Sequence, residues 1–93
     1  PRESTAVASL ETGPANWVSR EQPAGETELL VQIRHRHRPV PARVEPLPDG
    51  RCRVSFREPV DAAAPGQAAV FYDGDWLAGG GVIASTQQAA PSS

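Results

Sequence analysis

The residues best suited to chemistry in this 93-residue chain are arginines gathered in its middle. Residues 34–57 hold seven of the nine arginines and only two acids, a net charge of +5, whereas the remainder carries −7. A guanidinium group binds phosphate through paired hydrogen bonds, and each neutralised phosphate releases counterions. The middle of the chain is therefore a candidate surface for a polyanion. The candidate contacts are Arg34, His35, Arg36, Arg38, Arg43, Arg51 and Arg53.

Other uses of these residues remain open. If residues 34–38 form a strand, the three arginines lie on one face and the two histidines on the other. The arginines could then form a solvated face, or bond to acids of this domain or of another. His35 and His37 could ligate a metal, but zinc requires three or four protein ligands. The sequence offers no third ligand beside these two histidines, so we predict no metal site.

Three other features resemble reactive groups but have structural explanations. Cys52 alternates with Val54 and Phe56, which predicts a buried and unreactive thiol. The run of glycines at 79–81 lacks the lysine and helix of a phosphate loop, which favours a strand kink at a barrel corner. Trp76 lies beside a predicted hairpin tip and is a candidate exposed aromatic ring. Without a nucleophile–base pair or paired carboxylates, we predict no catalytic residue.

Ten prolines and eight glycines exclude long helices and predict short strands. Residues 51–56 alternate strictly, and Glu58-Pro59 is expected to end that strand. Turns are expected at Pro48-Asp49-Gly50, Pro65-Gly66 and Asp73-Gly74-Asp75. Turn signals about ten residues apart indicate a small antiparallel barrel or sandwich, and closure favours the barrel because it removes exposed edges. The predicted strands are residues 5–10, 16–18, 28–33, 42–47, 51–56, 68–72 and 76–85.

Composition narrows the class of protein. No run approaches the roughly 18 apolar residues of a membrane helix, and no signal peptide is recognisable. The single cysteine cannot close a disulfide within the chain. These features predict a soluble, intracellular domain, and Pro1 looks like an internal cut in a longer protein.

Residues 65–75 and 79–83 together resemble the C-terminal signature of bacterial tRNA-specific 2-thiouridylases. Further similar pieces follow the family order, so the resemblance covers roughly residues 5–85. Those pieces are residues 16–18, 31–36 and 56–60. The sequence departs from the family at Gln32, where a basic residue is common, and at His35 and His37, where tyrosine and glutamine are common.

The resemblance implies an all-β chain: a small closed antiparallel barrel of about six strands, similar to the second domain of elongation factor Tu. Residues 1–24 would be the end of a central domain and a linker, residues 25–86 the barrel, and residues 87–93 a disordered tail. The implied parent is an ATP-dependent tRNA uridine 2-sulfurtransferase, whose ATP loop and catalytic cysteines belong to other domains. No catalytic residue and no cofactor therefore fall within this chain.

The implied function is to help bind and position tRNA while the parent enzyme thiolates the wobble uridine. The implied partners are tRNA, the N-terminal and central domains of the parent chain, and a sulfur donor, either a cysteine desulfurase or a relay protein. A cytoplasmic monomer without membrane contact is expected. The alternative is a purely structural barrel that braces the central domain and does not contact RNA.

Overall fold

The computed structural model describes residues 6–18, 21–33, 38–61 and 63–89. Apart from one short 3-10 turn, its regular elements are strands. Within these ranges no helix is long and apolar enough to cross a membrane. The elements are β1 (Ala6–Thr12), β2 (Asn16–Trp17), β3 (Thr27–Gln32), β4 (Val40–Pro46), η1 (Pro48–Gly50), β5 (Cys52–Asp61), β6 (Ala68–Asp73) and β7 (Trp76–Gln88).

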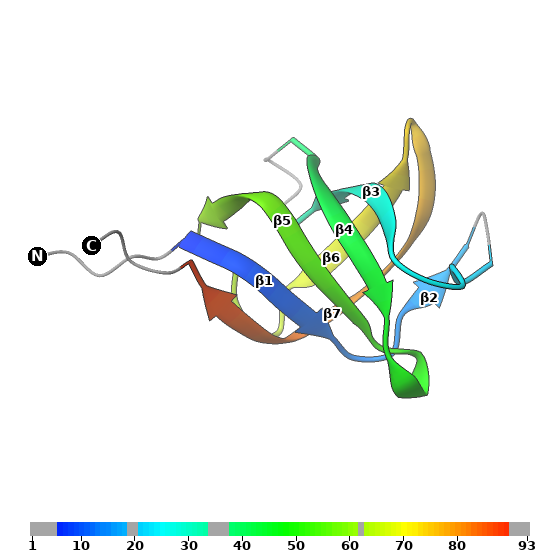
Figure 1. Ribbon diagram of the computed structural model, residues 1–93, viewed down its shortest axis with the longest axis horizontal. Helices are drawn as coiled ribbons and strands as arrows, with labels where there is room; N and C mark the ends of the chain where they lie inside the picture. The colour runs from blue at the N-terminus through cyan, green and yellow to red at the C-terminus, as the bar shows by residue number, and fades with distance from the viewer. Residues whose placement is uncertain (1–5, 19–20, 34–37, 62, 90–93) are drawn as a thin grey trace, which may run out of the picture.

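The strands close into an antiparallel barrel in the order β1-β5-β4-β3-β6-β7 (Figure 1). Strand β1 pairs with β5 on one side and with β7 on the other, which completes the ring. The short strand β2 lies outside the ring and pairs with β7. The prediction of a closed barrel of about six strands is confirmed. How residues 1–24 divide between domains of a longer protein stays a prediction, although β1 is part of this barrel.

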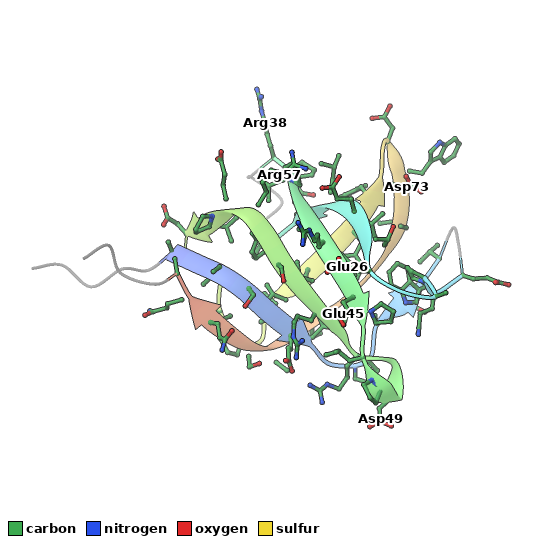
Figure 2. All side chains as sticks on the ribbon, viewed as in Figure 1. Glu26, Arg38, Glu45, Asp49, Arg57 and Asp73 are labelled. Carbon is green, nitrogen blue, oxygen red and sulfur yellow. The ribbon has the colours of Figure 1, made fainter. Side chains whose placement is uncertain are left out.

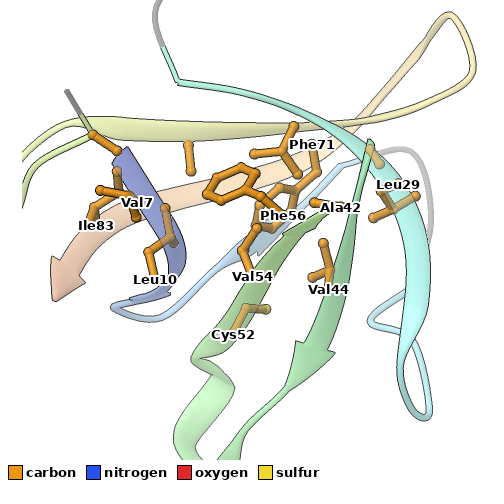
Figure 3. Close-up of a cluster of buried hydrophobic side chains, with 14 residues drawn as sticks. Val7, Leu10, Leu29, Ala42, Val44, Cys52, Val54, Phe56, Phe71 and Ile83 are labelled. Atoms are coloured by element: carbon orange, nitrogen blue, oxygen red, sulfur yellow. The ribbon is translucent and has the colours of Figure 1, made fainter. Parts of the chain in front are cut away.

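Alternation along the strands builds the core. In β5 the side chains of Cys52, Val54 and Phe56 point inward, as expected, and the residues between them are exposed. Valines and aromatic rings from the other strands meet them (Figure 3). Strand β6 alternates as well, with Ala69 and Phe71 buried. Val70 and Tyr72 on its other face are only partly buried, because a single-layer barrel leaves one face of each strand outside.

Strand β7 runs without interruption through the glycines at 79–81, where the sequence predicted a kink at a barrel corner. Its first half pairs with β6 and its second half with β1. A Cβ at Gly80 would lie 2.6 Å from the carbonyl oxygen of Ala69, and one at Gly79 would collide with the carbonyl oxygen of Asn16. A register shift lies beside Gly79. The glycines thus allow close approach of β7 to β2 and β6.

The turn chemistry is confirmed at the β4–β5 hairpin, where Asp49 and Gly50 have φ angles of 68° and 78°. The predicted end of β5 is wrong, because the strand continues through Pro59 to Asp61. The β1–β5 register jumps from Ser9↔Ser55 to Val7↔Val60, so residues 56–59 have no β1 partner in that ladder. Pro59, which has no N–H to donate, fits this irregular stretch.

Candidate functional site

Charged side chains collect on the outer surface of the half-barrel formed by β1, β5, β4 and β3. The alternation that buries one side of β5 turns Arg53, Ser55 and Arg57 outward. The register places Arg53 opposite both Glu11 and Glu45. We call this surface the charged face; its ionisable residues are Glu11, Glu28, Arg43, Glu45, Arg51, Arg53 and Arg57.

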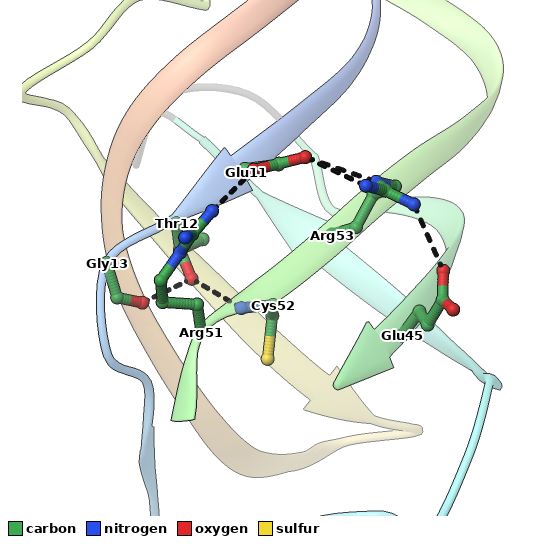
Figure 4. Close-up of polar contacts among 7 residues, drawn as sticks. All are labelled: Glu11, Thr12, Gly13, Glu45, Arg51, Cys52 and Arg53. Carbon is green, nitrogen blue, oxygen red and sulfur yellow. Dashed lines mark hydrogen bonds and ion pairs between the residues drawn. The ribbon is translucent and has the colours of Figure 1, made fainter. Parts of the chain in front are cut away.

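At one end of the charged face the arginines form ion pairs with carboxylates (Figure 4). Arg51 Nη2 donates to Glu11 Oε1 at 2.6 Å, and Arg53 Nη2 donates to Glu11 Oε2 at 3.0 Å. Arg53 Nη1 also lies 3.6 Å from Glu45 Oε1. The hydrogen bond from Arg53 and the positive charges of both arginines hold the pKa of Glu11 below its ordinary value. Two carboxylates therefore compensate these two arginines.

The other end is compensated less completely. Arg57 Nη2 donates to Glu28 Oε2 at 2.6 Å, and these side chains are 64% and 60% exposed. Arg43 lies directly opposite Glu28, yet it has no ion pair within the part of the chain that the structure describes. Arg38 precedes β4 at the end where Arg57 lies (Figure 2). A groove of about 340 Å³ opens here, lined by Glu28, Ala42, Arg43, Ser55, Phe56 and Arg57.

The predicted contacts fall into two groups. Arg38, Arg43 and Arg53 are exposed and Arg51 is half-buried, whereas Arg34, His35, Arg36 and His37 lie outside the described residues. Their contact with RNA stays a prediction. The net charge of the charged face is only +1, because Glu11 and Glu28, outside the arginine-rich window, fold onto it.

Arg57 was missed as a candidate, although it lines the groove. Its signal was present, since it continues the outward alternation of Arg53 and Ser55. Because the strand was expected to end beside it, Arg57 was not predicted to face outward with Arg53.

Cys52 takes no part in this surface. Its side chain is fully buried, and burial raises the pKa of its thiol, so the prediction of a core cysteine is confirmed. The Cys52 backbone N–H donates to Thr12 Oγ1 at 3.2 Å, and that hydroxyl donates to the carbonyl oxygen of Gly13 at 2.6 Å. Among the described residues, no group of three His, Cys, Asp or Glu side chains could hold a metal ion.

A different surface lies along β7 and the end of β2. Trp76 is 75% exposed, as expected from its place beside the hairpin tip. Leu77, Val82 and Val18 are the other large apolar side chains found exposed among the described residues. Val18 donates its N–H to the carbonyl oxygen of Ala78, which extends the pairing of β2 with β7 by one residue. This apolar surface contrasts with the charged face on the strands opposite.

Comparison with known proteins gives one family and many relatives. The sequence model of the aminomethyltransferase beta-barrel domain family matches residues 7–83. The tRNA-specific 2-thiouridylase MnmA of a Synechococcus species is 46% identical over 82 residues, which cover 88% of this chain and 23% of that protein. The protein of the same name from Chlorobium chlorochromatii is 50% identical over 68 residues, which cover 73% and 19%. The chain thus spans about a fifth to a quarter of the length of these relatives.

Proposed function

The chain belongs to the aminomethyltransferase beta-barrel domain family, and on that premise we propose that it is the non-catalytic C-terminal barrel of an ATP-dependent tRNA 2-thiouridylase. The observation that carries the proposal is 46% identity to a tRNA-specific 2-thiouridylase across 88% of this chain. The role proposed for the barrel is to bind and position tRNA. Activation of the wobble uridine with ATP, and sulfur transfer from a cysteine persulfide, would take place in the N-terminal and central domains of the parent enzyme in the cytoplasm.

The charged face supports a role in binding. Arginines fixed on barrel strands present their guanidinium groups from a rigid support, which limits the entropy lost when phosphate binds. Phosphate contacts orient a protein on nucleic acid and require no base recognition. Such contacts suit a domain that holds tRNA while another domain reacts with it.

Binding of an unmodified tRNA transcript to the 93-residue chain tests the proposal, with affinity followed by fluorescence anisotropy over a salt series. We expect weak binding whose logarithm falls linearly with the logarithm of salt concentration. The double substitution Arg34→Ala/Arg36→Ala should lower the affinity further. Absence of binding at low salt would contradict the role in tRNA binding.

A second candidate function, bracing of the parent enzyme, is favoured by the exposed side chains of Trp76, Leu77 and Val18. Such apolar side chains commonly pack against protein. Removing the barrel from the Synechococcus relative separates the two functions. Loss of tRNA affinity with an unchanged melting temperature supports tRNA binding. A lower melting temperature with unchanged affinity supports bracing.

A further inference from the structure

We propose that the groove between β3, β4 and β5 binds one phosphodiester group of RNA, held by Arg43, Ser55 and Arg57. This inference rests on the proposed function and assigns its contact to a place on the barrel. Two of these residues, Ser55 and Arg57, were not among the contacts predicted from the sequence. We call this place the phosphate groove.

The geometry of the phosphate groove suits a small tetrahedral anion. Arg43 on β4 lies directly opposite Ser55 on β5, and Arg57 is the next outward residue along β5. Directly opposed residues have Cβ atoms about 5 Å apart, and alternate residues of a strand are about 6.6 Å apart. Two guanidinium groups can therefore reach one phosphate with the Ser55 hydroxyl between them. Ala42 and Phe56 complete the lining.

The charges favour an anion here over the other end of the charged face. In the phosphate groove one carboxylate, that of Glu28, lies beside two arginines and, among the described residues, bonds only to Arg57. One positive charge is left over, on Arg43. At the other end, the carboxylates of Glu11 and Glu45 balance Arg51 and Arg53. An incoming phosphate therefore meets uncompensated charge only in the groove, among the described residues of this face.

The Glu28–Arg57 pair does not block the phosphate groove. Both side chains are more than half exposed, and water weakens ion pairs of this kind. Arg57 can therefore exchange the carboxylate for a phosphate oxygen at small cost. Arg43 needs no exchange and makes the first contact. Glu28 acts as a competitor that occupies Arg57 until RNA binds.

The first experiment compares arginines on the same face of the neighbouring strands β4 and β5. Affinity for an unmodified tRNA transcript at low salt should fall about three- to tenfold in Arg43→Ala and in Arg57→Ala. Each substitution should reduce the salt slope by about 0.7 to 0.9. Arg53→Ala removes the same charge from the same face of β5 and should change affinity less than twofold. A thermal melt of each variant checks that the barrel is folded.

The second experiment seeks a gain of affinity, which unfolding cannot mimic. Glu28→Gln frees Arg57 and should raise tRNA affinity about threefold, the effect of removing one weak competing pair. Glu26→Gln removes the same charge from an exposed position just before β3 and should have a smaller effect. Ser55→Ala should weaken binding, whereas Ser85→Ala, an exposed serine on β7, should not.

The outcomes separate this inference from the proposed function. If the unsubstituted chain does not bind tRNA at low salt, the tRNA-binding function itself fails. If the chain binds tRNA but Arg53→Ala weakens binding as much as Arg57→Ala, binding follows overall charge and the phosphate groove is wrong. The groove is equally wrong if Glu28→Gln binds no better than Glu26→Gln, while the broader function stands.

Discussion

Thr12 offers a test of how the barrel satisfies its buried polar groups. Its side chain is fully buried, and Oγ1 accepts the N–H of Cys52 at 3.2 Å. Thr12→Val keeps the shape but removes this acceptor, so the Cys52 N–H loses its partner inside the barrel. A buried donor without a partner costs about 1–3 kcal/mol. Gly13, whose carbonyl oxygen loses the other hydrogen bond, is only half-buried as a residue, so water can replace that bond and we expect a loss of about 2 kcal/mol.

Thermal and urea unfolding of the 93-residue chain measure this loss. A change of 2 kcal/mol should lower the melting temperature by about 8–16 °C in a domain of this size. Thr86→Val on β7 is the matched control, because Thr86 is less buried and no hydrogen bond of its hydroxyl is seen in the described structure. It should change stability by less than about 0.5 kcal/mol. Equal effects of the two substitutions would refute the assignment of this role to the Thr12 hydroxyl.

Two further predictions concern the barrel. Gly80→Ala should destabilise the chain by about 2 kcal/mol or more, because its Cβ would press on the carbonyl oxygen of Ala69. Urea unfolding measures the free energy of unfolding. An unfolding free energy equal to that of the unsubstituted chain within error would contradict the close approach of β6 and β7. Glu11→Gln should destabilise the chain near neutral pH, where ionised Glu11 binds Arg51 and Arg53. Because folding lowers the pKa of Glu11, this contribution is complete above the unfolded pKa and is lost as pH falls through the folded value. Melting temperatures of variant and parent should therefore converge toward about pH 3, and a constant difference across that range would show that the carboxylate charge is not responsible.

The barrel was predictable where burial follows a local period. The alternation through Cys52, Val54 and Phe56 fixes the two faces of β5 because one face of a barrel strand meets the core. The turn at Asp49 and Gly50 was predictable for an equally local reason, since few residues adopt positive φ. Each of these features is specified by a few consecutive residues.

The charge balance of the outer surface was not predictable from the same patterns. Arg53 meets Glu11 from β1, 42 residues away in sequence, and only the register of β1 against β5 brings the two together. A count of charges along the chain misses such pairs, and it overestimates the positive charge of the charged face. The course of β5 past Pro59 was missed for a similar reason, because it depends on an irregularity in pairing with β1. Long-range register decides both features.

The position of an arginine along the charged face therefore separates two roles. Glu11 on β1, Arg53 on β5 and Glu45 on β4 form one row across three strands, and β1 is the strand that closes the barrel onto β7. The charges of this row hold one another and support the closure. Arg43 and Arg57 lie farther along the strands, where a single carboxylate faces two guanidinium groups. Substitutions in the row should therefore change stability first, and substitutions in the phosphate groove should change affinity for RNA first, because, of these two places on the described surface, the groove is the one with an arginine left unpaired.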